Sequence, residues 1–239
     1  MANIALIIAG GHGARMKQDI PKQFINVNDK PVIIYTLEAF QNHPEINAIY
    51  VVCLDGWQGF LEAYSKQYKI TKLKGIVEGG KCGQESIYNG ICAISKNYSN
   101  EDLILVHDAI RPLVSGDTIS DNIATCGKFG NAITVIPCME AMLRSDDQIE
   151  SDESILRDSL FRAQTPQTIS VGDAVQLHKE AAEKGITDSV ATCTLLIELG
   201  RKVFFAKGSE LNIKITKSDD ITLLKALLMA NGNCGGQHL

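Results

Sequence analysis

The chain begins with a continuous apolar run, Ile4 to Ala9, and three glycines follow within four residues, at Gly10, Gly11 and Gly13. An unbroken apolar run of this length predicts a strand that is buried on both faces, as the strands of parallel sheets are. Parallel strands need long crossover connections, which are usually helical. The start of the chain therefore favours an α/β fold, in which strand and helix patterns should alternate.

The alternation continues almost to the C-terminus. Strand patterns follow at Ala48 to Leu54, Gly75 to Glu78, Leu103 to Val106, Ala132 to Ile136 and Lys202 to Ala206, with an extended segment at Ile213 to Thr216. Helical patterns lie at Val32 to Phe40, Gly56 to Gln67, Ser86 to Ile94, Thr118 to Gly127, Val171 to Glu183, Ser189 to Leu199 and Asp220 to Met229. Together they predict an α/β fold with a mainly parallel, doubly wound, Rossmann-like sheet. No linker rich in Pro, Gly or Ser interrupts the 239 residues, so residues 1–239 are expected to form a single domain.

One segment departs from this pattern. Met139 to Ser159 is polar, acidic and poor in apolar periodicity. We expect a hairpin or a protruding arm that leaves the body at about residues 139–160. The polar, Gly-rich end of the chain, Asn231 to Leu239, is expected to fray.

Charge and cysteine usage exclude several classes of partner. The formal net charge is -5 and no basic stripe is present, which argues against nucleic-acid binding. The seven cysteines form no CxxC pair, as expected for reduced, partly buried thiols in the cytoplasm. The run Ile4 to Ala9 follows no basic segment and is too short for a signal peptide or a membrane span. We therefore expect a cytoplasmic protein with no membrane partner.

Three informative stretches fall at the ends of predicted strands: Ala9 to Arg15, Gly79 to Ser86 and His107 to Pro112. Ligands of parallel α/β sheets bind beyond the carboxyl ends of the strands. The three stretches are therefore expected to meet in one site.

The glycines after the first strand point to phosphate binding, because they let backbone N–H groups approach phosphate oxygens. A tight strand-to-helix turn would explain the glycines alone. The run lacks the third glycine of the dinucleotide fingerprint, since position 16 is methionine, and no P-loop Gly-Lys-Ser/Thr follows. A plain NAD-linked dehydrogenase is therefore disfavoured. Arg15 and Lys22 lie close behind and fit a triphosphate, with Lys22 neutralising charge on the α-phosphate during transfer.

Beyond these residues, the chain resembles a known family. Ala9 to Met16 followed by Pro21-Lys22-Gln23 is similar to nucleotidyltransferases that activate sugars and polyols. Later motifs come in the order seen in the 2-C-methyl-D-erythritol 4-phosphate cytidylyltransferase family, of which D-ribitol-5-phosphate cytidylyltransferase is a close sister. These motifs are Gly79-Gly80 with Ser86, Val106 to Pro112, Thr165-Pro166-Gln167 and Asn212 to Thr216. The resemblance covers residues 4 to about 228.

The resemblance implies a CTP pocket and a catalytic set. Arg15, Lys22 and Lys214 would be catalytic, the first two by gripping the triphosphate. Substrate binding would fall to Ala9, Gly10, Gly11, Gly13, Gly80, Ser86, Asp108, Ala109, Arg111 and Arg157. Within that set, Gly80 and Ser86 would lie near the base and Ala109 near the ribose.

The family also implies a metal ion and a second subunit. Asp108 would sit by the α-phosphate and bind Mg²⁺, while Arg111 and Lys214 complete the anionic site. Arg157 matches an arginine that reaches the polyol phosphate from a neighbouring subunit, so a homodimer is expected. The acceptor phosphate is already ionised, so Asp108 is better explained as a metal-binding or orienting residue than as a base. His107 is expected to be structural.

Several residues favour the ribitol branch. The turn reads Ala-Gly-Gly, as the ribitol enzymes do, and Gln164-Thr165-Pro166-Gln167 leans the same way. Ala141 stands where the methylerythritol branch usually has threonine, and the arginine common near Gly83 is absent. We therefore expect CMP transfer from CTP to D-ribitol 5-phosphate, a teichoic acid or capsule precursor, with release of pyrophosphate. The alternative acceptor is 2-C-methyl-D-erythritol 4-phosphate, for isoprenoid biosynthesis by the non-mevalonate pathway.

Two further hypotheses remain open at the level of sequence. One is a nucleotidyltransferase that uses another nucleoside triphosphate and a sugar 1-phosphate. The other is a non-catalytic nucleotide-binding regulator. The cluster of Arg15, Lys22, Asp108 and Lys214 argues against the regulator, because a pure binder does not need it.

Overall fold

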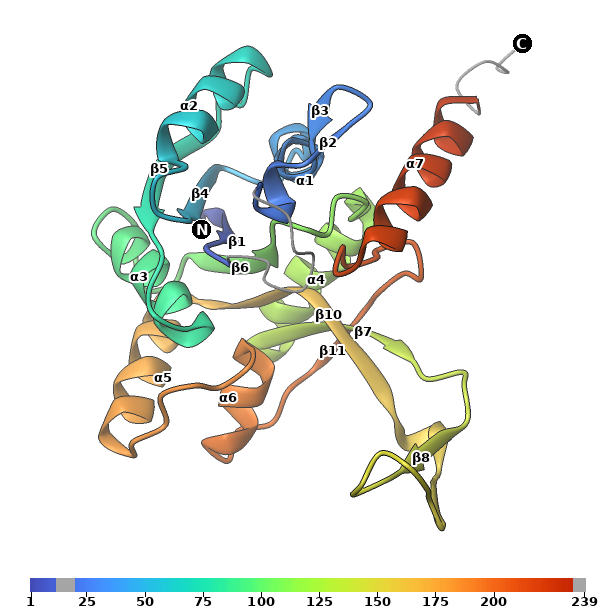
Figure 1. Ribbon diagram of the computed structural model, residues 1–239. Coiled ribbons are helices and arrows are strands. Elements are labelled where there is room, and N and C mark those ends of the chain that lie inside the picture. Colours follow the sequence, from blue (N-terminus) through green and yellow to red (C-terminus); the bar gives the residue numbers. More distant parts are fainter. Residues whose placement is uncertain (12–19, 234–239) are drawn as a thin grey trace.

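The computed structural model describes residues 1–11 and 20–233, and its centre is a seven-stranded sheet (Figure 1). The strand order is β11-β7-β10-β6-β1-β4-β5. The strands are β1 (Asn3–Ala9), β4 (Ala48–Cys53), β5 (Leu73–Glu78), β6 (Leu103–Asp108), β7 (Asn131–Pro137), β10 (Phe161–Ser170) and β11 (Phe205–Lys207). Of these, β10 alone runs antiparallel to its neighbours, β6 and β7. The predicted mainly parallel α/β fold is confirmed.

The strand order places a crevice at the end of β1. From β1 the chain moves outward to β4 and β5, then returns to the other side of β1 with β6. Both β4 and β6 pair with β1 in parallel register. Connections that leave in opposite directions open a gap beyond the carboxyl ends of the two strands, where ligands of such sheets bind. Here that gap lies between the Gly10 turn and Asp108.

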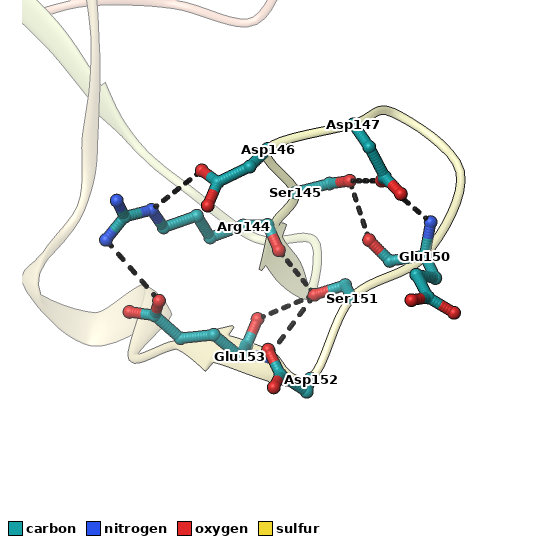
Figure 2. A pocket seen from close by; sticks show the side chains of 8 residues that line it. All are labelled: Arg144, Ser145, Asp146, Asp147, Glu150, Ser151, Asp152 and Glu153. Atoms are coloured by element: carbon teal, nitrogen blue, oxygen red, sulfur yellow. Dashed lines mark hydrogen bonds and ion pairs between the residues drawn. The ribbon is translucent and has the colours of Figure 1, made fainter.

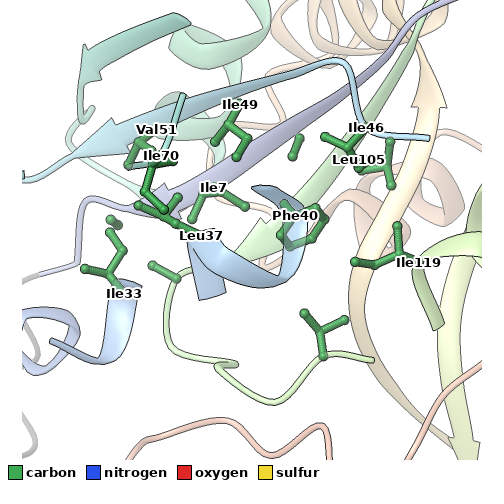
Figure 3. Packing of buried hydrophobic residues seen from close by; sticks show 14 of the residues in the cluster. Ile7, Ile33, Leu37, Phe40, Ile46, Ile49, Val51, Ile70, Leu105 and Ile119 are labelled. Carbon is green, nitrogen blue, oxygen red and sulfur yellow. The ribbon is translucent and has the colours of Figure 1, made fainter. Parts of the chain in front are cut away.

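Helices cover both faces of the sheet because alternate side chains of the central strands are apolar on both sides. In β1, Ala5 and Ile7 face one buried cluster, and Ile4 and Leu6 face the other. The first cluster is closed by α1 (Val32–Asn42), α2 (Gln58–Gln67) and α4 (Gly116–Phe129). Figure 3 shows Ile33, Leu37 and Phe40 of α1 packed against strand residues. The second is closed by α3 (Gly83–Ser95), α5 (Val171–Glu183) and α6 (Thr192–Glu198).

The arm is present as an antiparallel hairpin of β8 (Met142–Arg144) and β9 (Glu153–Ile155). It stands away from the sheet, between the end of β7 and the start of β10 (Figure 1). A short helix, η3 (Arg157–Ser159), leads back into β10. The expectation of a hairpin or arm over about residues 139–160 is thus confirmed.

Smaller elements flank the crevice. The short helix η2 (Lys22–Phe24) precedes a hairpin of β2 (Asn26–Val27) and β3 (Lys30–Pro31). The last helix, α7 (Ser218–Asn233), packs through Leu224 against Ile110 and Ile215 in a third apolar cluster. Among the described residues, no helix is both long enough and apolar enough to cross a membrane.

Several predicted boundaries differ from those of the structure, and one strand was not predicted. The helix expected from Gly56 begins at Gln58, because Gly56 has a positive φ of 78° that no helix accepts. The helix expected over Ser189 to Leu199 forms only at Thr192–Glu198, because buried side chains bind the backbone before it. The strand expected over Lys202 to Ala206 is Phe205–Lys207, and the ten-residue β10 was missed altogether.

Candidate active site

Asp108, the last residue of β6, is the centre of a charged cluster. Its Oδ2 lies 3.1 Å from Nε of Arg111 and 3.1 Å from Nζ of Lys214. Arg111 is buried and also donates from Nη1 to the carbonyl of Asn212, at 2.7 Å. The Asp108 and Lys214 side chains keep 22% and 43% exposure, so the cluster remains open to a ligand. The motif that contains Asp108 and Arg111 thus meets the motif that contains Lys214, as expected, although about a hundred residues of chain separate them.

The two cations determine the charge state of Asp108. Burial raises the pKa of this carboxyl, but Lys214 and then Arg111 lower it by more, so the net pKa lies below its ordinary value. Asp108 is therefore ionised at neutral pH. One carboxylate between two cations leaves a net positive charge at the end of β6, which suits an anionic ligand.

His107 lies beneath this cluster and is fully buried. Burial lowers the pKa of His107 to about 4, so the ring is neutral. The carbonyl of Arg111, 3.2 Å from Nε2, can only accept, so Nε2 carries the ring hydrogen. Nδ1 then accepts from the Thr165 hydroxyl at 3.0 Å, and that oxygen accepts from the Asp108 amide at 3.1 Å. His107 thus has the structural role predicted for it, which is to fix the backbone at Asp108 and Arg111.

A cavity of about 370 Å³ opens beside the cluster. Asp108, Arg111 and Lys214 line it, with Gln164, Thr165 and Gln167 of β10 on a second side. The remaining wall comes from Gly83 and Ile87 of α3 and from Val190, Ala191, Thr192, Cys193 and Thr194. The cavity combines an apolar floor with one concentrated group of charges, as small-molecule sites commonly do.

The glycine turns lie at the other side of the crevice. The Gly80 amide donates to Ser86 Oγ at 2.9 Å, so Ser86 holds the turn after β5. A side chain at Gly80 would collide with Glu85, so the close approach there requires glycine. A methyl group on Gly10 would lie 3.5 Å from Ser86 Oγ, which shows that the two predicted turns meet.

Gln23, which is next to Lys22 in η2, holds the glycine turn that follows β1. Its Nε2 donates to the carbonyls of Ala9 at 2.8 Å and Gly11 at 3.1 Å. Lys22 is therefore held beside the turn by its neighbour. Ala109 is fully buried; its amide donates to Ile8 and its carbonyl accepts from Thr36, so it supports β6 from within and offers no side-chain surface.

The structure does not test two of the predicted site residues, and it places a third, Arg157, away from the cavity. Gly13 and Arg15 lie outside the described residues. Arg157 sits in η3 at the base of the arm, where its Nη1 donates to the Met139 carbonyl at 3.0 Å. Arg157 is not among the residues that line the cavity of its own chain.

Several neutral residues of the site belong to the recognised motifs, but the sequence predicted no role for them. Gln164, Gln167 and Asn212 are buried, and Gln164 donates to the Ser209 carbonyl while Asn212 donates to that of Thr165. These bonds join β10 to the segment that carries Lys214. The available signal was a run of polar residues, Gln164 to Gln167, in a stretch with no turn or surface pattern.

A second hollow, of about 570 Å³, lies at the tip of the arm, away from the crevice (Figure 2). Arg144 bridges Asp146 and Glu153, and Ser145 and Ser151 bind neighbouring groups of the same loop. The side chains of Asp146, Asp147 and Glu153 are thus engaged within the loop itself. No group of three or more His, Cys, Asp or Glu side chains in the described parts of the chain is placed to hold a metal ion.

Comparison with known proteins adds to this geometry. A family model described as 2-C-methyl-D-erythritol 4-phosphate cytidylyltransferase matches residues 3–230. A ribitol-5-phosphate cytidylyltransferase of Lacticaseibacillus paracasei is 40% identical, over 94% of this chain and 97% of its own. A 2-C-methyl-D-erythritol 4-phosphate cytidylyltransferase of Clostridium acetobutylicum is 36% identical, over 96% and 98%. The crystal structure of the latter enzyme from Francisella tularensis matches with a TM-score of 0.79 and 26% identity, over 95% and 99%.

Proposed function

Because the chain belongs to the 2-C-methyl-D-erythritol 4-phosphate cytidylyltransferase family, we propose that it transfers CMP from CTP to D-ribitol 5-phosphate. The products would be CDP-ribitol, a teichoic acid or capsule precursor, and pyrophosphate. The observation that carries the proposal is the joining of Asp108, Arg111 and Lys214 beside a cavity at the switch point of the sheet.

The reaction needs placement and charge more than covalent help. An oxygen of the acceptor phosphate attacks the α-phosphorus of CTP and forms a new P–O bond. The bond from that phosphorus to the bridging oxygen of the β-phosphate breaks, and its electron pair leaves on pyrophosphate. The attacking oxygen is already ionised, so no general base is required. Lys22 and Lys214 would offset the charge that builds on the α-phosphate, together with Arg15.

The CTP side of the site is proposed from the two glycine turns. Exposed Gly11 and half-buried Gly10 and Gly80 leave backbone surface free for a nucleotide. Ser86 holds the Gly80 turn in place. The proposed nucleotide contacts are those that the family resemblance gives: Ala9, Gly10, Gly11, Gly13, Gly80, Ser86, Ala109, Arg15 and Lys22. For Ala109 such contact could come only through its neighbours, because the residue itself is buried.

Asp108 would hold a Mg²⁺ ion together with the CTP phosphates. It is the only carboxylate among the described residues that line the cavity. One or two carboxylates plus substrate phosphates are a common ligand set for Mg²⁺, so the residues fit the ion. When bound, the ion would draw charge from the triphosphate. Lys214 and Arg111 keep Asp108 ionised and oriented for this role.

The choice of acceptor rests on the relatives and on this chain's own residues. Curated relatives named for ribitol 5-phosphate reach 40% identity, and those named for the methylerythritol substrate reach 36%. The Gln164 to Gln167 run also leans to the ribitol branch, and Ala141 stands where the methylerythritol branch usually has threonine. 2-C-Methyl-D-erythritol 4-phosphate remains the second candidate acceptor, because the family model is named for it.

We further propose that the active form is a homodimer in which Arg157 serves the other subunit's acceptor. Arg157 is exposed and lies outside the cavity of its own chain. The arm around it carries exposed apolar side chains, including Leu143 at 65% and Leu156 at 71%. The cytoplasm is the proposed location, supported by six unpaired cysteines among the described residues.

The test is an acceptor panel with purified protein. CTP is offered with D-ribitol 5-phosphate, 2-C-methyl-D-erythritol 4-phosphate, erythritol phosphate or glycerol phosphate, and pyrophosphate release is followed. The highest kcat/KM is expected with D-ribitol 5-phosphate, and CTP should be preferred over ATP, GTP and UTP. A higher kcat/KM with 2-C-methyl-D-erythritol 4-phosphate would show that this compound, and not D-ribitol 5-phosphate, is the acceptor. If no polyol phosphate supports pyrophosphate release, the proposed function is overturned.

A further inference from the structure

Residues 190–194 line the cavity together with Asp108 and Lys214, and they form the second half of the segment of residues 186–194. This segment joins α5 to α6 and is irregular until α6 begins at Thr192 (Figure 1). Val190 is 88% exposed, while Thr192 is buried. Over residues 187–190 the described structure contains no backbone–backbone hydrogen bond. The position of this part of the cavity wall therefore depends on side chains that reach it from elsewhere.

Gln84 supplies two of these bonds. Its Nε2 donates to the Ile186 carbonyl at 2.7 Å, and its Oε1 accepts from the Ser189 amide at 2.7 Å. The side chain is buried, so loss of either bond would leave a backbone group without a partner away from water. Gln84 thus holds the irregular stretch at two points, Ile186 and Ser189.

Two further side chains complete the attachment. The Cys82 thiol donates to the Thr187 carbonyl at 3.2 Å, and Gln167 Oε1 accepts from the Cys193 amide at 2.9 Å. Cys82 caps α3 and Gln84 lies in its first turn, whereas Gln167 belongs to β10. The wall is therefore held mainly by the start of α3.

The same turn of α3 shapes the nucleotide side. Ser86, two residues after Gln84, accepts the amide of Gly80. Glu85 accepts the amide of Lys81 through Oε2 at 2.7 Å. Successive side chains of one helical turn thus hold the Gly80 turn on one side and the 186–194 segment on the other.

We propose that Gln84 is a positioning residue for the acceptor, acting through the 186–194 segment rather than by touching the reacting atoms. Its carboxamide holds this wall at the distance from Asp108 and Lys214 that the polyol phosphate requires. The inference rests on the proposed function, because it takes the cavity as the acceptor pocket. CTP, bound over the glycine turns, depends on Ser86 and Gly80 instead.

The experiment compares Gln84→Ala and Gln84→Glu with the wild-type enzyme. Gln84→Glu keeps the shape and the acceptor for Ser189 but loses the donor to Ile186, so it tests the bond if the alanine variant folds poorly. The matched control is Gln41→Ala. Gln41 likewise accepts a backbone amide, that of Lys72 at 2.8 Å, and donates to Thr71, but it lies on α1 away from the cavity.

Gln84→Glu, which loses one buried hydrogen bond, is expected to raise KM for D-ribitol 5-phosphate by about tenfold, and Gln84→Ala, which loses both, by at least as much. KM for CTP and kcat should stay within about twofold of wild type, and Gln41→Ala should leave all three unchanged. Hydrogen exchange at residues 186–190 should rise in the Gln84 variants and not in the control.

An unchanged acceptor KM in both Gln84 variants, or an equal rise in KM for CTP, would overturn the inference. A wild-type enzyme that releases no pyrophosphate with any polyol phosphate would instead overturn the proposed function. The two failures are therefore distinguishable in the same series of assays.

Discussion

At the scale of single residues, the neutral state of His107 is central to the site. A charged imidazole would place a third cation beside Arg111 and Lys214 and would lose its ability to accept from Thr165. Burial prevents this by lowering the pKa of His107 to about 4. The ring acts as a fixed spacer whose two nitrogens set the backbone at Asp108 and Arg111. The proton chemistry of the reaction does not involve it.

Lys22→Ala is expected to reduce kcat by about a hundredfold or more while changing CTP affinity only a few-fold, because its charge matters most in the transition state. Single-turnover kinetics and CTP titration measure the two quantities separately. Lys30→Ala is the matched control, since Lys30 lies in the neighbouring hairpin and pairs with Glu38. A loss of the same size in turnover and in affinity would contradict this role.

The charged site residues and the glycine turns were predictable from sequence, and the buried neutral residues that support the charged cluster were not. Asp108, Arg111 and Lys214 stand in motifs whose only economical explanation is an anionic ligand. Thr165 and Asn212 gain their roles from what lies next to them, a buried histidine ring and a strand end. Such partners are fixed by strand order, which a single sequence does not reveal.

At the scale of elements, β10 shows why the sequence pattern fell short. A ten-residue strand in the middle of a sheet is expected to be apolar, but this one contains Gln164, Thr165, Pro166 and Gln167. Its pairing with β7 shifts register between Ala163 and Gln167, at that polar run. Buried partners satisfy the polar groups, as when Asn122 and Thr134 donate to the Pro166 carbonyl. The sequence of β10 therefore does not show the apolar pattern of an interior strand, because its polar groups bind buried side chains instead of the backbone of neighbouring strands.

The interface between α3 and α5 contributes a pH dependence of stability. His178 of α5 stacks on Tyr88 of α3, with ring centroids 5.1 Å apart, and burial lowers its pKa to about 4. Burial lowers the pKa of His107 in the same way, from the ordinary histidine value of 6.5. Between pH 6.5 and 4 the unfolded chain binds protons at these two sites and the native protein does not, so stability falls as the pH falls.

Urea unfolding between about pH 6 and 4.5 should therefore show a slope that approaches about 1.4 kcal/mol per pH unit for each of the two histidines. His178→Asn should remove about half of this slope, because only His107 then remains. Gln41→Ala, at a side chain that does not titrate, is the control and should leave the slope nearly as it was. An unaltered slope in the His178 variant would show that its ring is protonated in the native state.

At the scale of the whole molecule, the arm is the part least supported by the rest of the chain. Its strands pair only with each other, and Met139, Leu143 and Leu156 are exposed. An apolar surface of this kind on a hairpin that leaves the body usually marks an association site. This supports the proposed homodimer.

Leu143→Glu combined with Leu156→Glu is expected to yield a monomer by light scattering, because charges would replace the apolar contacts between subunits. Pyrophosphate release should fall with it, since Arg157 would no longer reach the second site. Phe60→Glu, an equally polar change at an exposed position on α2, should leave both unchanged. A fully active monomer would end the dimer proposal.

One strand, β10, links regions that would otherwise be independent modules. Its first residues, at Phe161, form the base of the arm, and its middle, at Gln164 and Thr165, borders the reaction cavity. Grafting an arm from a relative to alter substrate preference would thus also tilt the cavity wall if the junction fell at Phe161. Crossover points placed at Asn131 and Ser170, where β7 begins and β10 ends, would transplant both parts as one rigid insert.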